Sequence, residues 1–367
     1  DEEIFDDIKD GGTGVSTTYL YGSSGTGKTY TVKVKMDETE GKADPRTFEG
    51  TYLNGRKYDT YHKFMVKLLD CLDDRFPVTK NGKVYENVPA SGHPTSFFYD
   101  LLQELMEQKD FRLLVVMDEI DKLELKEAGQ IISMFWDLKS EGFDVQLVTI
   151  SNDPVMLEKL DPDINRRIGN KIHFPTYDTF QLYEILVEFA KRALKDDAWE
   201  REKVLNDEGQ DKELWKIASE AAQTSGSASE AKKLLYHVAK RSEDTLNSDL
   251  IDDAREKVEK QMIKEEVMSK PIQHIVALQA VARAHMKYEE AQRNGGRSEQ
   301  HATTTSVIRD KYEELCDDYR MPKKSKRTLV RMLNSLEKDD LISSSLEGLG
   351  RGRGVARSHL VLLAEGD

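Results

Sequence analysis

Cysteine is scarce in this chain of 367 residues, which contains only Cys71 and Cys316. Two cysteines so far apart make neither a paired metal-binding motif nor a disulfide framework, so the sequence favours a reducing, intracellular setting. No run approaches the roughly 18 apolar residues that would span a bilayer. The first four residues lack the basic and apolar pattern of a signal peptide, and a start at Asp rather than Met predicts a fragment or a processed chain. We expect a cytoplasmic protein without a membrane partner.

Positive charge is also in deficit, because 68 acidic side chains face 54 basic ones and leave a net charge of −14. Taken whole, this balance argues for a soluble protein and against a generally basic coat for nucleic acid. Although 33% of the residues are charged, 38% are hydrophobic, so the composition differs from that of a disordered segment. At about 150 residues per domain, the length predicts two or three folded domains.

Strands alternate with helices in the first half of the chain, which predicts βαβ crossovers and a parallel sheet. The expected strands are Thr17–Tyr21, Thr47–Leu53, Leu113–Met117 and Val145–Ser151. The expected helices are Thr29–Glu38, Tyr61–Leu72, Ser96–Gln108 and Glu127–Ser140. Residues 76–94 are rich in Gly, Pro, Asn and Ser, and we expect an exposed insertion or loop there.

Helical patterns replace the strand signals after residue 175, so the first predicted domain covers residues 1–175. Residues 176–268 are expected to form a helical domain that ends in a long charged linker helix, with helices at Phe180–Leu194, Leu214–Ala222, Glu230–Arg241 and Asp249–Met268. Residues 269–367 show the order of a winged helix-turn-helix. Its expected helices are Gln273–Gln292, Thr304–Tyr319 and Lys324–Glu337, and its expected hairpin strands are Leu341–Ser345 and Ser358–Leu363.

A glycine-rich segment between the first predicted strand and the first predicted helix fits the P-loop pattern without a mismatch. Its glycines let successive backbone N–H groups point at phosphate oxygens, and the helix N-terminus adds a partial positive charge. In such a loop Lys28 reaches the β and γ phosphates, and the hydroxyl of Thr29 ligates Mg²⁺. The predicted nucleotide-binding residues are Gly22, Ser23, Ser24, Gly25, Thr26, Gly27, Lys28 and Thr29.

Two carboxylates, Asp118 and Glu119, follow the third predicted strand, which places them at the carboxyl edge of the sheet beside the P-loop. In this Walker B arrangement Asp118 holds Mg²⁺, and Glu119 orients or deprotonates the attacking water. Asn152 ends the next strand at the same edge, where it is either a ligand of the γ phosphate or an ordinary turn residue. The adjacent Arg166 and Arg167 are either a solvated patch or supply a finger that neutralises transition-state charge.

The acidic total conceals a basic C-terminal region. Residues 320–357 carry ten basic and four acidic side chains, a local balance of +6 that leaves −20 for the rest of the chain. On the last predicted helix the basic side chains fall on one arc and the apolar ones on the opposite arc. In a winged helix this helix enters the major groove, although a basic amphipathic helix is in other proteins only a solvated face.

Glycines and arginines at residues 348–354 lie between the two hairpin strands and predict a wing that reaches a narrow minor groove. Ser325, Thr328 and Asn334 are candidates for reading bases, and the sequence leaves open which of them do. The predicted DNA-binding residues are Lys323, Lys324, Lys326, Arg327, Arg331, Arg351, Arg353 and Arg357.

Together these motifs resemble an AAA+ ATPase and, more narrowly, the archaeal replication initiators related to the origin recognition complex and the cell-division-cycle loading ATPase. The resemblance is carried by Tyr21–Thr29, Thr51–Thr60, Leu114–Leu123, Ile150–Asp153, Ile172–Leu186 and the C-terminal hundred residues. It implies an α/β P-loop AAA+ domain with a parallel sheet, a helical lid domain and a C-terminal winged-helix domain. On matching positions it implies that Asn152 is the sensor 1 residue and Arg167 the arginine finger.

One position departs from the family pattern. Gly226 to Ser229 reads Gly-Ser-Ala-Ser where the family has Gly-Asp-Ala-Arg, so Ser229 occupies the position of the sensor 2 arginine. Lys232 or Lys233 can replace the charge but not the planar fork of a guanidinium. We therefore expect ATP to be bound more firmly than it is hydrolysed.

The resemblance implies an initiator that recognises origin duplex DNA and promotes loading of a replicative helicase, with ATP, ADP and Mg²⁺ as cofactors. It also implies a nucleoid-associated protein and self-association on DNA. Two alternatives stay open. One is a P-loop signalling ATPase or transposition helper with a winged-helix tail, and the other is a plasmid copy-control DNA-binding protein with a structural nucleotide.

Overall fold

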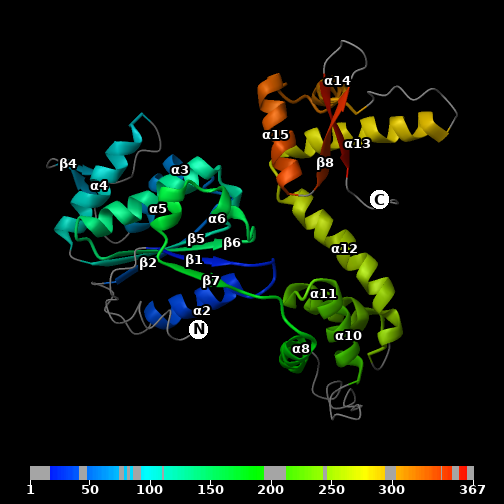
Figure 1. The fold of residues 1–367 in the computed structure, drawn as a ribbon, viewed down its shortest axis with the longest axis horizontal. Helices are drawn as coiled ribbons and strands as arrows, with labels where there is room; N and C mark the ends of the chain where they lie inside the picture. Colours follow the sequence, from blue (N-terminus) through cyan, green and yellow to red (C-terminus); the bar gives the residue numbers. More distant parts are fainter. Residues whose placement is uncertain are drawn as a thin grey trace. The chain divides into compact units, whose positions relative to one another are not determined.

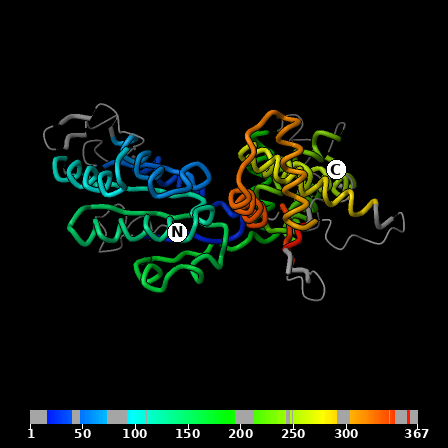
Figure 2. The backbone as a smooth tube through the Cα atoms, turned by 90° about the horizontal axis from the view of Figure 1, so that it is seen from above, coloured from blue at the N-terminus to red at the C-terminus, as the bar shows by residue number. Residues whose placement is uncertain are grey.

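The computed structural model describes residues 17–40, 48–73, 78–80, 83–85, 92–109, 111–193, 212–242, 246–293, 303–339, 341–348 and 355–361. The chain divides into two compact units, residues 1–249 and residues 250–367, which Figure 2 traces in sequence colours. The division into three domains at residues 175 and 268 stays a prediction. Among the helices of the described ranges, none is both long and apolar enough to cross a membrane.

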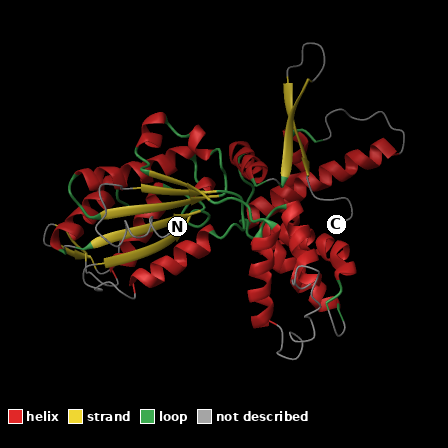
Figure 3. Ribbon diagram, turned by 60° about the horizontal axis from the view of Figure 1, so that its bottom comes forward, coloured by secondary structure: helices red, strands yellow, loops and turns green. Residues whose placement is uncertain are grey.

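A five-stranded parallel sheet forms the centre of the first unit, drawn in yellow in Figure 3. Its strands, in spatial order, are β2 (Phe48–Asn54), β5 (Arg112–Asp118), β6 (Val145–Ser151), β1 (Thr17–Tyr21) and β7 (Asn170–His173). Every neighbouring pair runs parallel. The carboxyl ends of β1, β5 and β6 therefore meet at one edge of the sheet, where ligands bind in open α/β folds.

Helices cover both faces of this sheet, as Figure 1 shows. They are α2 (Lys28–Glu40) on one face and α3 (Tyr61–Asp73), α4 (Thr95–Gln108) and α5 (Leu125–Ser140) on the other. Along β5 the side chains alternate, so that Leu114 and Val116 pack with Val32 of α2 while Leu113 and Val115 join the core formed with α3, α4 and α5. Because both faces are covered, the central strands read as continuous apolar runs.

The described residues after β6 in the first unit are mostly helical. After β6 come α6 (Met156–Lys159) and α7 (Pro162–Arg166), and after β7 come the lid helices α8 (Thr179–Ala193), α10 (Lys212–Thr224) and α11 (Ala228–Arg241). Each lid helix buries an apolar stripe, with Leu182 and Leu186 on α8, Leu214 on α10 and Leu234 on α11 fully buried. These stripes hold the lid together.

The described residues of the second unit form four α-helices and a hairpin. They are α12 (Ile251–Met268), α13 (Ile272–Arg293), α14 (Thr305–Asp318), α15 (Lys326–Lys338), β8 (Ile342–Gly348) and β9 (Val355–Val361). Helices α13, α14 and α15 pack around one core whose largest member is Tyr312, and Figure 2 shows them in yellow and orange. Strands β8 and β9 pair antiparallel, as in the hairpin of a winged helix.

The predicted fold class is confirmed, and a few elements differ from the sequence-based expectation. Residues 78–80 and 83–85 form a small antiparallel hairpin, β3 (Val78–Lys80) and β4 (Lys83–Tyr85), inside the expected insertion. The sequence pattern does not predict strand β7, because its side chains alternate only between half-buried and exposed. Helix α15 begins at Lys326 rather than Lys324, since the hydroxyl of Ser325 accepts the N–H of Thr328 as an N-cap.

Candidate functional site

A cleft of about 730 Å³ lies in the first unit between the carboxyl edge of the sheet and the lid helices α8 and α11. It brings together residues that are far apart in the sequence, from the loop after β1, from α2 and β5, from the turn after β6, and from α8 and α11. Of the predicted nucleotide-site residues, the lining includes Ser24, Gly25, Gly27, Lys28, Thr29, Asp118, Glu119 and Asn152. Ser229 and Lys232 of α11 line it from the lid side.

The P-loop wraps around the amine of Lys28, which is 3% exposed. Its Nζ donates to the carbonyl oxygens of Gly22 at 2.9 Å and Ser23 at 2.7 Å. Burial lowers the pKa of Lys28, and the nearby carboxylates of Asp118 and Asp121 act in the opposite direction. The amine is thus held at the centre of the loop, where it can contact a group bound there.

Glycine is required where the loop meets the lid. Gly25 has a φ of +78°, and a Cβ at this position would lie 2.0 Å from Oγ of Ser227. The backbone N–H of Ala228 donates to the carbonyl oxygen of Gly25 at 3.1 Å. The first turn of α11 therefore packs directly against the phosphate-binding loop.

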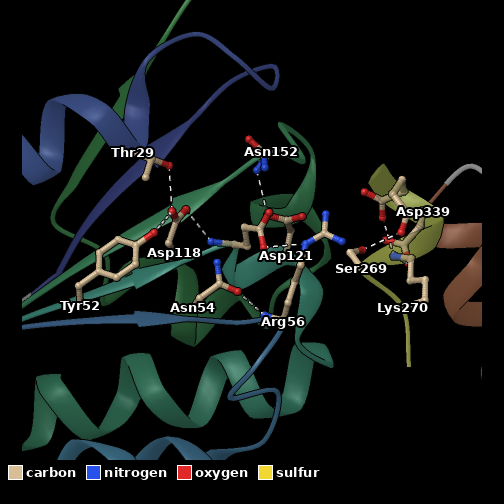
Figure 4. Close-up of polar contacts among 12 residues, drawn as sticks. Thr29, Tyr52, Asn54, Arg56, Asp118, Asp121, Asn152, Ser269, Lys270 and Asp339 are labelled. Atoms are coloured by element: carbon tan, nitrogen blue, oxygen red, sulfur yellow. Dashed lines mark hydrogen bonds and ion pairs between the residues drawn. The ribbon is translucent and has the colours of Figure 1, made fainter. Parts of the chain in front are cut away.

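Asp118 is the best-buried carboxylate in the cleft, with 4% of its surface exposed. Its Oδ2 accepts from the hydroxyl of Thr29 at 2.8 Å and from the phenol of Tyr52, while its Oδ1 accepts the N–H of Glu119 at 2.8 Å (Figure 4). Burial, followed by the hydrogen bond to Asp118, raises the pKa of Tyr52 well above its usual value. The phenol stays protonated and acts as a donor that fixes the carboxylate.

Glu119 has a different environment from its neighbour. Its backbone is in the left-handed region, with a φ of 54°, and Oε2 pairs with Nε of Arg56 at 2.8 Å. The Arg56 backbone N–H in turn donates to Oδ1 of Asn54 at 2.9 Å (Figure 4). The loop after β2 thus holds the side chain that the sequence predicts as the general base.

Asn152 lies at the carboxyl end of β6 and lines the cleft. Its backbone N–H donates to Oδ1 of Asp121 at 2.9 Å, a contact drawn in Figure 4. This bond joins the turn after β6 to the turn after β5, so Asp121 is a positioning residue for Asn152.

The chain between β7 and α8 connects the P-loop to the lid. The phenol of Tyr177 donates to the carbonyl oxygen of Thr26 at 3.0 Å, and its backbone N–H donates to Gly226 at 3.0 Å. One residue therefore bonds both to the phosphate-binding loop and to the turn just before α11.

Three cationic side chains line the cleft: Lys28 from the P-loop, Arg192 from α8 and Lys232 from α11. Lys232 follows Ser229 by three residues, so both lie on the same side of α11. Its amine sits 5.7 Å from the ring centre of Phe189. The lid thus presents positive charge one helical turn beyond Ser229.

Arg167 lies apart from this cleft, at the end of α7. It pairs with Asp137 of α5 at 3.6 Å and is 32% exposed, and it is not among the residues that line the cleft. The adjacent Arg166 pairs with Asp163 at 2.9 Å and is largely exposed. A role for Arg167 as a finger would therefore concern the cleft of a neighbouring molecule.

Helix α15 of the second unit combines a buried apolar face with an exposed basic one. Leu329, Met332, Leu333 and Leu336 are buried. Lys326, Arg327, Arg331 and Lys338 of this helix are exposed, as are Lys323 and Lys324 just before it. Lys323 pairs with Asp317 at 2.7 Å, which raises its pKa through the hydrogen bond.

Arg357 lies on β9 and bonds to α15. Its Nη1 donates to Oδ1 of Asn334 at 2.8 Å, and its Nη2 contacts the carboxylate of Glu337. The two wing arginines of the prediction, Arg351 and Arg353, lie outside the described residues.

Two family models match the chain. One, described as an AAA domain, covers residues 13–154, and the other, described as the C-terminal winged helix domain of CDC6, covers residues 265–367. The ORC1-type DNA replication protein of Pyrococcus abyssi is 25% identical over 351 residues, which is 92% of this chain and 75% of that protein. ORC1-type DNA replication protein 1 of Archaeoglobus fulgidus is 27% identical, over 93% of this chain and 77% of its own. The chain belongs to the archaeal ORC1/Cdc6 family of AAA+ proteins.

Solved structures agree with this family at the level of the fold. The Aeropyrum pernix ORC1 protein, solved in complex with DNA, matches with a TM-score of 0.69 and 21% identity, over 98% of this chain and 87% of that one. Cdc6p from Pyrobaculum aerophilum matches with a TM-score of 0.55 and 19% identity, over 97% and 89%.

Sequence reasoning missed several residues of this ORC1/Cdc6 family member's cleft. Tyr52 and Arg56 come from β2 and the loop after it, and only the β2–β5 register, which pairs Asn54 with Asp118, brings them to the acidic pair. Tyr177 comes from the segment between β7 and α8, and Arg192 comes from α8. Asp121 is the last residue of the Asp-Glu-Ile-Asp sequence, and its spacing of three residues from Asp118 is the sequence signal that points to a place near the cleft.

Proposed function

We propose that this protein is an ATP-dependent replication initiator that recognises origin duplex DNA and promotes loading of a replicative helicase, with ATP binding and slow hydrolysis as the switch. The observation that supports this most directly is that one chain carries both a P-loop cleft closed by a helical lid and a winged helix with an exposed basic face. Relatives matched over 92% of the chain are named ORC1-type DNA replication proteins, and the Aeropyrum pernix ORC1 structure contains DNA.

In this proposal the nucleotide phosphates lie in the P-loop and Lys28 holds the β and γ phosphates. Mg²⁺ fits the donors present, since the Thr29 hydroxyl and the Asp118 carboxylate are 2.8 Å apart and are hard oxygen ligands. Within the described ranges no group of three or more His, Cys, Asp or Glu side chains could hold a metal alone, as expected for an ion completed by phosphates and water. When bound, Mg²⁺ neutralises negative charge on the phosphates.

Two features support slow hydrolysis. Glu119, the proposed general base, is paired through Oε2 with Arg56, and a carboxylate paired with a cation is a weaker base toward the attacking water. Ser229 has no charge to offer, and Lys232 supplies an ammonium rather than a planar guanidinium. Asn152 is proposed to orient the attacking water or bond the γ phosphate.

Contacts between molecules belong to the same proposal. Arg167 would act as a finger in the cleft of a neighbouring copy bound to the same DNA, which requires self-association. The helicase partner and the nucleoid location follow from the family and are proposed on that ground.

The test separates the two sites of the chain. Lys28→Ala should abolish retention of ATP, because the loop loses its only buried cation, while salt-dependent binding of duplex DNA is largely kept. Equilibrium titration with labelled ATP measures ATP retention, and a separate titration with a pool of duplexes measures DNA binding. Lys35→Ala is the matched control, since Lys35 lies on the same helix but pairs with Glu38 at 3.1 Å. Loss of ATP and DNA binding together in Lys28→Ala would argue against separate sites.

A further inference from the structure

The exposed side of α15 forms a narrow stripe of side chains. Arg327, Arg331, Asn334 and Lys338 fall within an arc of about 60° at 100° per residue, directly opposite the buried leucines. All four are exposed. Asn334 is the one uncharged member of this stripe, and it stands between two cations suited to phosphate contacts.

The orientation of the Asn334 amide is fixed by the hairpin. Nη1 of Arg357 donates to its Oδ1 at 2.8 Å, and a guanidinium has donors only, so the amide oxygen must face Arg357. Arg357 is itself held, because Glu337 binds its other terminal nitrogen and the hydroxyl of Thr305 donates to its carbonyl oxygen at 3.2 Å. The side chain therefore offers its Nδ2 group outward.

This Nδ2 group has no hydrogen-bond partner within the described part of the chain. Its two N–H bonds are the only neutral donors on a stripe of positive charge. We propose that Asn334 reads a base edge in the major groove as a donor only, and that Arg357 is the positioning residue that imposes this. The inference rests on the proposed binding of duplex DNA and adds to it the kind of base that is recognised.

The donor-only state determines the base. An unrestrained Asn recognises adenine with both atoms, accepting from N6 and donating to N7. Because Oδ1 is turned toward Arg357 and one of its two lone pairs is already occupied, it is a weaker acceptor for adenine N6, and guanine, whose N7 and O6 are both acceptors, becomes the better match. Cytosine, which presents a donor at N4, is rejected. The predicted preference at the contacted position is guanine over adenine, with cytosine excluded.

The experiment is selection of binding sites from a random duplex library by the full-length chain, followed by sequencing. Wild-type protein should select guanine at one position, and Asn334→Ala should lose the preference at that position alone, by about fivefold, the lower end for one base contact. Arg357→Met, which removes the donor, should shift the same position toward adenine. Arg357→Gln keeps a donor and should retain guanine.

The control is Arg331→Ala, which should weaken binding to all sequences and leave the base preference unchanged. Thermal unfolding of each variant tests whether it is folded. Asn334→Ala changes an exposed residue, so the reading role of Asn334 stays testable even if an Arg357 variant unfolds. An identical profile for wild type and Asn334→Ala overturns the reading role, and an unchanged guanine preference in Arg357→Met overturns the positioning role. A wild-type chain that binds no duplex would instead remove the proposed function itself.

Discussion

At the residue scale, two adjacent carboxylates in the cleft have different partners. Asp118 is fixed by hydrogen bonds from Thr29, Tyr52 and the backbone, as a metal ligand needs to be. Glu119 is instead paired with Arg56, which lies in the loop after β2. The two adjacent carboxylates therefore differ in their partners, because neutral donors hold Asp118 and a cation pairs with Glu119.

Arg56→Ala is predicted to raise ATP turnover by about two- to fivefold. The ion pair with Arg56 stabilises the ionised Glu119 by roughly 0.5–1 kcal/mol, and proton transfer to Glu119 must overcome this stabilisation. Phosphate release at saturating ATP measures it. Lys57→Ala is the matched control, since the Lys57 amine lies 5.4 Å from the ring centre of Tyr58. A turnover below that of wild type in Arg56→Ala would mean that Arg56 assists the reaction instead.

At the scale of elements, sequence patterns predict those whose burial is continuous. Strands β1 and β6 have the predicted bounds because almost all their residues are buried and both are rich in residues that favour strands. Strand β7 escaped detection because it is a four-residue edge strand with half its side chains exposed, and β3 and β4 have three residues each. The P-loop was predictable as a local motif, whereas Tyr52 and Arg56 depend on strand register, which no local pattern reports.

The hairpin is joined to α14 by a buried histidine, His359 on β9. Its Nδ1 lies 2.8 Å from Oγ of Ser344 on β8, and its Nε2 lies 3.1 Å from Oγ1 of Thr305 on α14. Burial lowers the pKa of His359 to about 4; Arg357 acts in the same direction, and Glu337 opposes it. The neutral ring is therefore the form that the folded hairpin requires.

The second unit is predicted to lose stability as the pH falls from about 6.5 to about 4. In this window the unfolded chain binds a proton at His359 that the folded unit does not, so stability rises with pH and is highest above 6.5. The loss has an upper bound of about 3.5 kcal/mol, because the pKa of His359 falls by about 2.5 units and each unit corresponds to about 1.4 kcal/mol. NMR titration of the histidine rings in the full chain, with urea unfolding of wild type and His359→Gln, measures it. Equal pH dependence in both proteins would contradict the prediction.

At the scale of the whole molecule, charge is divided along the chain. The total of −14 separates into +6 for residues 320–357 and −20 for the remainder. A basic C-terminal region in an otherwise acidic chain favours approach to DNA by that region. The remaining residues are repelled by the phosphates, which orients the encounter. The acidic total thus does not oppose DNA binding.

Replacing Arg327 and Arg331 together by Ala is predicted to weaken duplex binding and to reduce the slope of log K against log salt by about two, one for each lost phosphate contact. Titrations at several salt concentrations measure the slope. Arg283→Ala with Lys287→Ala is the matched control, because these exposed residues have the same spacing on α13. A slope equal to that of wild type in the α15 variant would remove α15 as the DNA-facing helix.

The bond between Tyr177 and Thr26 has a mechanical consequence for the lid. The same residue bonds to Gly226, two residues before α11 begins, so Tyr177 joins the phosphate-binding loop to the N-terminal end of this helix. Helix α11 has 14 residues and is about 21 Å long. A rotation of about 10° at that end would move the far end of the helix by about 4 Å, by the same geometry. A small change of angle beside a bound phosphate would therefore become a displacement of several ångströms at the far end of α11.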